Sequence, residues 1–440
     1  DVSELTLGES ALLAGLPPAP SEYSPLINPE GAKERQKFVL DKMVSLGYIS
    51  EDQAKAAYEE EIRVAEHVEY IQAPHFVEYI REQLDTMYGK RFVENGGLTV
   101  VTTLDLDVQK AAQEIVTSEV ERNLKLNITN GAAVVLGVDE AEILAYVGSV
   151  DYFKDEWGRF DVASASRQPG SSIKVLTYSL AFAQGMKPTT KIVDKPTVFN
   201  IKGSKPYIPV NYDGKFHGEM TLRDALANSY NVPAVQLASK VGPDNIVKLG
   251  REMGLKDWAA DGSYGLSITL GGEEVRLVDL ANVYATLARS GTYKELSGIL
   301  YIEDSRGYNI YEKQEKEGKK VLDEKVTEYI WNILSDNNAR LPAFGTRNFL
   351  SIDNAKVAVK TGTTDEKRDN WTFGYSDKYV VGVWVGNNDN SPMNKSLASG
   401  LSGAAPIWNR IMTHVVGGGA VQLQDTSAKV SSLHKPEQIP

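Results

Sequence analysis

The sequence predicts an α/β fold, in which an antiparallel sheet is sandwiched between helices and a helical subdomain is inserted beside it. Two groups of strand-like segments, at 132–149 and 355–387, lie far apart in the chain. The short connections within each group favour antiparallel pairing. Residues 171–345, between the groups, have mostly the pattern of helices and loops. A sheet that is split in this way, with helices between its parts, is typical of an α/β sandwich.

The chain begins with a small helical region. Apolar spacing predicts helices at 4–16, 30–48, from Ser50 onward, 76–88 and 105–125. Pro17 and Pro18 end the first helix, and Ser50 is placed to cap the third. The β-branched segment LTVVTTLD (98–105) predicts a strand before the last of these helices.

The two strand groups account for the predicted sheet. The segment at 132–149 predicts a hairpin that turns near Asp139, and further strands are predicted at 355–364, 370–376 and 378–387. A closing helix is expected at 403–416. Residues 421–440 are polar and contain two prolines, so we expect a weakly ordered tail there.

Composition excludes several classes of function. The formal net charge of −12 argues against nucleic acid or an anionic membrane surface as a general partner, because both attract basic proteins. The absence of cysteine excludes disulfides and thiolate catalysis. The five histidines form no HExxH motif, so no metal site is expected. No apolar run is long enough to span a bilayer, and the first residue, Asp1, suggests a fragment of a longer protein.

The segment RQPGSSIKVL (167–176) carries the first candidate for chemistry. Residues three apart share a helix face, so Ser171 and Lys174 are expected to be neighbours, while Ser172 points elsewhere. A serine at a helix start lies near the positive end of the dipole, which stabilises a developing oxyanion. A buried lysine can be neutral and accept the serine proton. The alternative is a capping serine followed by a surface lysine, but the apolar continuation VLTYSLAFA favours a buried helix.

A second candidate, KTGTT (360–364), ends a predicted strand. Lys360, Thr361 and Thr363 could hold an anionic group at a sheet edge, and Gly362 would let a ligand backbone approach closely. An extended peptide could add to this edge as a further strand. Taken alone, the same stretch is better explained as a polar hairpin turn.

A third element, Ser-x-Asn, occurs at two candidate places. Ser335-Asp336-Asn337 follows a predicted helix, where such residues are typical of a cap and turn. Ser229-Tyr230-Asn231 lies between apolar runs, with Pro233 expected to break the helix behind it. Polar side chains there are costly unless they face a cleft or find partners. We therefore select Ser229 and Asn231.

These elements resemble a known signature of penicillin-binding proteins and class A β-lactamases, namely S-x-x-K, S-D-N and K-T-G in this order. The second motif has Tyr230 in its middle position, which the family pattern allows to vary. Several longer stretches resemble the transpeptidase domain of a class A high-molecular-weight penicillin-binding protein, in family order: RQPGSSIK, ALANSYNVPAV, ITLGGEEVRLVDLANVYATLA (268–288) and KTGTTDEKRDNWTFGYSDKYVVGVWVGNNDNSPM (360–393). The opening ESALLAGLPPAPSEYSP is similar to the end of that family's glycosyltransferase domain. The catalytic glutamate motif of that domain is missing from the sequence, and so is a membrane anchor.

The resemblance implies a penicilloyl-serine transferase, or β-lactamase-like, fold. It divides the chain into residues 1–65, a C-terminal remnant of the glycosyltransferase domain; residues 66–105, an interdomain linker; residues 106–420, the transpeptidase domain; and residues 421–440, the tail.

The resemblance also implies a function, namely cross-linking of peptidoglycan stem peptides that end in D-Ala-D-Ala. Ser171 would be the acylated nucleophile and Lys174 its base. Ser229 would pass a proton to the leaving group, and Asn231 would orient the substrate. Lys360, Thr361 and Thr363, with Gly362 between them, would bind the substrate carboxylate. The backbone amides of Ser171 and Thr363 would form the oxyanion hole.

The resemblance further implies that β-lactams acylate and inhibit the protein, and it implies no cofactor. The full-length protein would be anchored in the membrane, would act outside the cytoplasm with cell-wall synthesis partners, and would also carry glycosyltransferase activity. Three rival functions remain: a serine β-lactamase, a non-catalytic β-lactam sensor, and a helical scaffold with coincidental motifs. A class A β-lactamase needs a glutamate for its deacylating water, and GGEEVRL (271–277) does not match the usual context of that glutamate.

Overall fold

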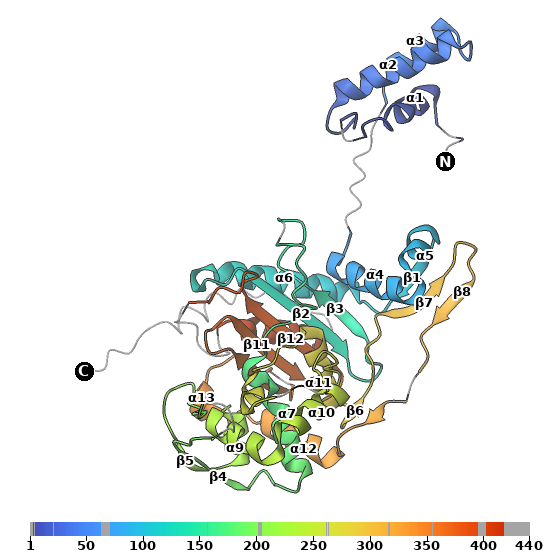
Figure 1. The fold of residues 1–440 in the computed structure, drawn as a ribbon. Coiled ribbons are helices and arrows are strands. Elements are labelled where there is room, and N and C mark those ends of the chain that lie inside the picture. The colour runs from blue at the N-terminus through green and yellow to red at the C-terminus, as the bar shows by residue number, and fades with distance from the viewer. Residues whose placement is uncertain are drawn as a thin grey trace. The chain divides into compact units, whose positions relative to one another are not determined.

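The structure is a computed structural model, which describes residues 3, 5–20, 22–62, 71–155, 157–200, 205–260, 262, 264–315, 317–353, 355–394 and 402–417. The chain forms two compact units, residues 1–72 and 73–440 (Figure 1). The tail predicted at 421–440 lies outside the described residues.

The first unit contains three helices, α1 (Leu7–Gly15), α2 (Pro29–Ser45) and α3 (Glu51–Glu59). The predicted Ser50 cap is confirmed, because its side chain accepts from the amide of Gln53 and the Gln53 side chain accepts from the amide of Ser50. Such a reciprocal pair satisfies two backbone donors that a helix start leaves free. A buried glutamine of α2, Gln36, donates to the carbonyl of Gly8 and so ties α2 to α1.

The second unit is built on a five-stranded antiparallel sheet with the order β10-β11-β12-β2-β3. Its strands are β2 (Asn130–Gly137), β3 (Ile143–Val147), β10 (Ala358–Thr363), β11 (Asp369–Tyr375) and β12 (Tyr379–Gly386). The two strand groups predicted from sequence therefore form one sheet, joined where β12 pairs with β2. The prediction of antiparallel pairing is confirmed.

Helices cover both faces of this sheet (Figure 1). Along β2, alternate residues belong to different cores: Ala133 and Val135 pack in one cluster, and Ala132 and Val134 in the other. The first cluster contains residues of α6 (Leu106–Arg122) and α14 (Ala404–Val416), and the second contains residues of α11 (Leu277–Ala288). This alternation is the period of a strand with two buried faces, and it confirms the predicted sandwich.

The second unit begins with α4 (Pro74–Tyr88) and α5 (Lys90–Asn95), which lead to β1 (Thr99–Thr102). The strand predicted at 98–105 is therefore confirmed. It pairs with β7 (Ile299–Glu303), which pairs in turn with β8 (Asn309–Glu312).

The inserted region contains the helices α7 (Lys174–Ala183), α8 (Leu222–Ala227), α9 (Asn231–Val241), α10 (Pro243–Glu252), α12 (Glu324–Leu334) and α13 (Leu341–Phe344). It also contains short strands that the sequence pattern did not indicate, namely β4 (Lys191–Asp194), β5 (Gly218–Thr221), β6 (Thr292–Tyr293), β7, β8 and β9 (Lys319–Lys320). These strands lie outside the main sheet in small sheets of two or three strands, whose pairing partners a single sequence does not identify.

Within the described ranges, no helix combines the length and the apolar character that crossing a bilayer requires.

Candidate active site

Ser171 lies in a 3₁₀ turn, Gly170–Ile173, that runs directly into α7. The α-helix predicted to begin at about Ser171 begins instead at Lys174. Residues three apart are eclipsed in a 3₁₀ turn, so the expected shared face for Ser171 and Lys174 is retained. Ser172 has another role, because its hydroxyl is buried and donates to the carbonyl of Pro169 at 2.7 Å. The predicted burial of the following helix is confirmed, since Lys174 and most of its apolar neighbours are buried.

Two glycines bring this turn against the end of β10. A Cβ atom on Gly170, whose φ is +54°, would lie 2.6 Å from the carbonyl oxygen of Thr363. A Cβ atom on Gly362 would lie 2.3 Å from the carbonyl oxygen of Pro169. The sequence suggested that Gly362 makes room for a ligand backbone, whereas the close approach observed here is that of the protein's own nucleophile turn.

We expect Gly170→Ala to destabilise the fold more than a glycine replacement at positive φ alone. Gly185 is a matched control, because its φ is +93° and nothing lies within 4 Å of a Cβ atom placed there. Both variants strain the backbone, but only Gly170→Ala also overpacks the turn, which adds about 1–3 kcal/mol to the loss of unfolding free energy. Urea denaturation measures this difference, and equal losses in the two variants would contradict the close-approach role.

Both candidate lysines reach the same serine of the Ser229-Tyr230-Asn231 segment. Lys360 Nζ donates to Ser229 Oγ at 2.7 Å, and Lys174 Nζ lies 3.5 Å from the same oxygen. Lys174 Nζ also donates to the carbonyl of Ser229 at 2.6 Å and to Asn231 Oδ1 at 2.7 Å. Four predicted site residues, from three separate segments of the chain, therefore meet at one place.

Burial lowers the pKa of both lysines. Burial and then the charge of Lys360 hold the pKa of Lys174 well below its usual range. Burial and then the charge of Arg340 lower the pKa of Lys360 to about 7. The oxygens around Lys174 Nζ favour its ammonium form, but they do not offset the loss of water around a fully buried amine. The charge of Lys360 therefore adds to burial in favouring a neutral Lys174.

The Ser229-Tyr230-Asn231 segment connects α8 to α9, and Ser229 has a φ of +60°. Left-handed backbone at a non-glycine residue costs free energy and is often found at functional sites. Pro233 was expected to break a helix; it lies instead in the first turn of α9, where its missing N–H removes no helical hydrogen bond.

The alternative Ser-Asp-Asn segment does not reach the lysines in this way. Ser335 is the C-cap of α12, and Asp336 pairs with Arg223 and accepts from the amides of Asn338 and Ala339. This is the cap-and-turn structure that the sequence indicated.

The KTGTT segment (360–364) begins on β10, which is an outer strand of the five-stranded sheet. Lys360 and Thr361 are buried, and Thr363 is partly exposed with its hydroxyl accepting from Asn370 Nδ2 at 3.0 Å. The Ser171 hydroxyl, which is half-buried beside this strand end, makes no hydrogen bond to any described residue, Lys174 included. In free enzymes such catalytic contacts often form only when substrate binds.

Sequence reasoning missed several residues that shape this site. Arg340, whose side chain is buried, affects Lys360 through its charge. Trp371 Nε1 and the Tyr284 hydroxyl hold the nucleophile turn by donating to the carbonyls of Gln168 and Ser172. Their importance depends on tertiary contacts, for which a single sequence carries no spacing signal. Among the described residues, no three histidine, aspartate or glutamate side chains are placed to hold a metal ion.

Comparison with known proteins adds a consistent result. Residues 131–413 match the family model of the penicillin binding protein transpeptidase domain, and residues 1–44 match a transglycosylase model. Penicillin-binding protein 2D of Bacillus subtilis is 32% identical over 94% of the chain, and penicillin-binding protein 1A of Aquifex aeolicus is 30% identical over 92%. The chain spans 60% and 66% of the lengths of these two relatives.

Solved structures show the same fold. The crystal structure of penicillin-binding protein 1A from Haemophilus influenzae matches with a TM-score of 0.80 at 20% identity, covering 97% of this chain and 82% of that one. The PonA1 protein from Mycobacterium tuberculosis in complex with penicillin V matches with a TM-score of 0.68 at 23% identity, covering 80% of this chain and 95% of that one. The predicted penicilloyl-serine transferase fold is thus confirmed.

Proposed function

Because the chain belongs to the penicillin-binding protein transpeptidase family, we propose that it is the catalytic part of a serine D-Ala-D-Ala transpeptidase that cross-links peptidoglycan. The observation that supports this function best is the meeting of Lys174, Lys360 and Ser229 next to the turn that carries Ser171. Two buried lysines with lowered pKa around a serine pair provide a base and a cation in one site.

In the proposed acylation, Ser171 Oγ attacks the carbonyl carbon of the terminal D-Ala-D-Ala bond. The neutral amine of Lys174 takes the hydroxyl proton. The amides of Ser171 and Thr363 face the oxyanion. As the carbon–nitrogen bond breaks, a proton passes through Ser229 to the nitrogen of the departing D-Ala. The products are an ester on Ser171 and free D-alanine.

The second step transfers the acyl group to an amine. An amine of a neighbouring stem peptide attacks the ester, gives its proton back through the lysine pair, and releases the Ser171 hydroxyl. Attack by water instead of the amine gives carboxypeptidase activity. Lys360, Thr361 and Thr363 hold the terminal carboxylate of the donor peptide during acylation, and Asn231 orients its amide. Each of these residues thus has the role that the family resemblance implies.

A β-lactam would follow the same first step. Its strained amide opens onto Ser171, but the leaving nitrogen stays tethered to the acyl group and blocks the second step. The experiment is intact-protein mass spectrometry after benzylpenicillin, followed by peptide mapping. One penicilloyl group on the peptide that contains Ser171 supports the proposed function. An adduct elsewhere, or none, would count against it.

A β-lactamase would give a different result in a turnover assay. Under the proposed function, a chromogenic cephalosporin gives one rapid equivalent of product followed by very slow release. Sustained fast turnover would favour the β-lactamase alternative. A β-lactam sensor would acylate without cross-linking, so turnover of a D-Ala-D-Ala thioester analogue separates the sensor from the transpeptidase.

The longer protein is proposed to be bifunctional. The match of residues 1–44 to a transglycosylase model supports a glycosyltransferase activity in the longer protein. Such a protein would be anchored in the cell membrane, would act on the cell wall outside the cytoplasm, and would work with other cell-wall synthesis proteins.

The proposed mechanism predicts a bell-shaped pH dependence for the second-order rate of acylation by penicillin. The rate requires a neutral Lys174, so it falls at acid pH. It also requires a charged Lys360, whose pKa is lowered to about 7, so it falls again as the pH rises through this value. Lys360→Arg stays charged at all these pH values. This variant is expected to lose the alkaline limb, and the same limb in both proteins would contradict the role of Lys360.

A further inference from the structure

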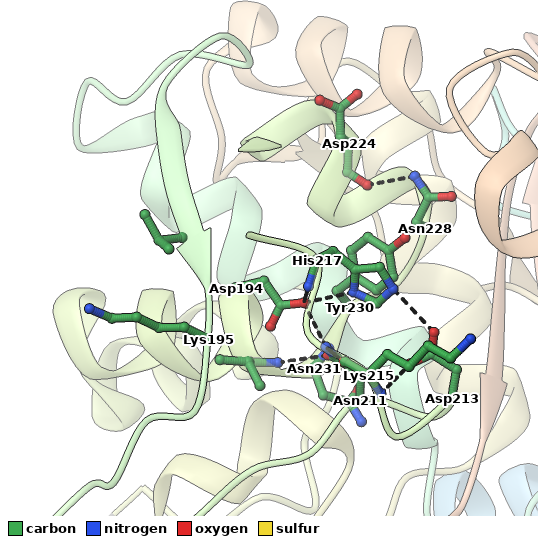
Figure 2. A network of polar contacts seen from close by, with 12 residues as sticks. Asp194, Lys195, Asn211, Asp213, Lys215, His217, Asp224, Asn228, Tyr230 and Asn231 are labelled. Atoms are coloured by element: carbon green, nitrogen blue, oxygen red, sulfur yellow. Dashed lines mark hydrogen bonds and ion pairs between the residues drawn. The ribbon is translucent and has the colours of Figure 1, made fainter. Parts of the chain in front are cut away.

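A network of polar contacts leads from a surface hairpin to Asn231 (Figure 2), whose Oδ1 accepts from the candidate base, Lys174. It begins at Asp194, which ends β4 opposite Gly218 of β5. The connection between these strands supplies three further polar residues, Asn211, Asp213 and His217. These four residues, here called the Asp194 cluster, belong to none of the three candidate motifs.

The carboxylate of Asp194 is the centre of the cluster. Its Oδ2 atom accepts from Asn211 Nδ2 at 2.7 Å, from the amide of His217 at 2.9 Å, and contacts His217 Nδ1 at 2.8 Å. The side chain of Asp194 is fully buried. All three contacts are made by Oδ2, whereas Oδ1 is buried and has no hydrogen-bond partner among the described residues. Because a buried carboxylate is costly without donors, the donors at Oδ2 tie Asn211 and His217 to Asp194.

Asn211 transmits this fixed geometry to α9. Because its Nδ2 donates to Asp194 and to the carbonyl of Lys215, its Oδ1 must face the other way. That oxygen accepts from the amides of Asn231 and Val232, at 2.8 and 3.3 Å. The N-cap residue itself, Tyr230, provides no side-chain bond. Asn211 therefore caps α9 from a loop about twenty residues upstream, in the place that a capping side chain normally takes.

The first residue of α9 completes the connection. Asn231 Nδ2 donates to the carbonyl of Val210 at 2.8 Å, and Asn231 Oδ1 accepts from Lys174 Nζ at 2.7 Å. The same loop thus holds the Asn231 backbone through Asn211 and the Asn231 side-chain amide through Val210. Because backbone and side chain are both held, Asn231 Oδ1 is fixed in the position from which it accepts from Lys174 Nζ.

His217 supports the middle residue of the same segment. Its ring stacks on Tyr230 with centroids 4.0 Å apart and an interplanar angle of 23°. Its two ring nitrogens face carboxylate oxygens of Asp194 and Asp213, at 2.8 and 3.1 Å. The carbonyl of Tyr230 lies 3.3 Å from Lys174 Nζ, so the residue on which His217 stacks also provides an acceptor for the lysine.

We propose that Asp194 and Asn211 are positioning residues for acylation, which act through Asn231 to hold the Lys174 amine in reach of the Ser171 hydroxyl. This inference rests on the proposed function. It predicts that the cluster affects the rate of the chemical step more than it affects substrate binding, because it acts through Asn231, which is proposed to orient the substrate and to hold Lys174 and not to bind the substrate carboxylate.

The test uses the whole chain, a fluorescent penicillin and rapid quenching at a series of penicillin concentrations. The variants are Asn211→Ala, the isosteric Asp194→Asn, and their combination. Glu219→Gln is the matched control, because Glu219 lies on the same hairpin in an exposed pair with Lys191 at 3.4 Å. Three quantities are measured: the rate of acylation at saturation, the half-saturating concentration, and the fraction of protein that becomes labelled.

We expect Asn211→Ala to lower the saturating rate on the order of tenfold to a hundredfold, with the half-saturating concentration and labelled fraction unchanged. The double variant is expected to raise the activation free energy by less than the sum of the two single increases, because Asp194 and Asn211 act in one hydrogen-bond network. A merely structural role would lower the labelled fraction and leave the rate of the labelled protein unchanged, and this result would overturn the inference. So would an Asn211→Ala rate equal to that of Glu219→Gln, or additive losses in the double variant. Failure of the unaltered chain to acylate at Ser171 would instead overturn the proposed function.

Discussion

Replacing Ser171 by alanine is expected to abolish covalent labelling by penicillin while leaving the fold intact. The ester in the proposed mechanism forms on Ser171 Oγ, so no other atom can replace it. The hydroxyl makes no hydrogen bond to a described residue, and the loss of unfolding free energy should therefore be about 0.5 kcal/mol or less. Gel fluorescence after incubation with a fluorescent penicillin measures the labelling, and circular dichroism on heating checks the fold.

The neighbouring serine provides the matched control. Ser172 is buried and donates to the carbonyl of Pro169, so Ser172→Ala is expected to lose about 1 kcal/mol of stability and still to be labelled. The assignment of the nucleophile is wrong if Ser171→Ala keeps its label, or if only Ser172→Ala loses it.

Replacing Lys174 by methionine is expected to produce the second largest effect. A general base contributes about a hundredfold to ten-thousandfold to the rate of the step it assists, and no other described side chain makes the same contacts to Ser229 and Asn231. We therefore expect the acylation rate to fall by about a thousandfold. Methionine is similar in length and suits a buried position, so the variant should remain folded.

Stopped-flow acylation compares this variant with Lys240→Met, a change at an exposed lysine near the end of α9. The control should acylate at the rate of the unaltered chain. A Lys174→Met rate within tenfold of the control would show that the serine proton goes elsewhere, with Lys360 as the next candidate.

Sequence patterns were sufficient to predict the structure where interactions within one segment determine it. The runs of apolar and β-branched residues in 132–149 and 355–387 placed every strand of the main sheet, because a strand buried on both faces is apolar along most of its length. Ser50 was recognisable as a cap from its own segment. The preference for Ser229 and Asn231 over Ser335 and Asn337 rested on polar residues between apolar runs, and the structure places the first pair, not the second, at the lysines.

Other features depend on contacts between distant segments and could not be read in this way. The 3₁₀ turn at Gly170–Ile173 packs closely against Gly362 of β10, nearly two hundred residues further along the chain. Arg340 lies near Lys360 although twenty residues separate them along the chain. The Asp194 cluster caps α9 through Asn211, whereas cap signals in a sequence are sought in the residue next to the helix.

The site also departs from the rules that govern the rest of the molecule. Lys174 lies on an otherwise apolar helix and is fully buried. Burying an amine beside a second lysine lowers stability unless the environment neutralises it. Sequences tend to break local rules of this kind at functional sites, and here the departure supplies the neutral amine that the proposed chemistry needs.

The central claim is that residues from distant segments converge on the Ser171 hydroxyl to acylate it, and a crystal structure of the chain after reaction with benzylpenicillin tests this most directly. We expect an ester bond to Ser171 Oγ, with the ester carbonyl oxygen at the amides of Ser171 and Thr363. We expect the penicilloyl carboxylate to lie at Lys360 and Thr361. An ester on another residue, or a carboxylate directed away from β10, would contradict it.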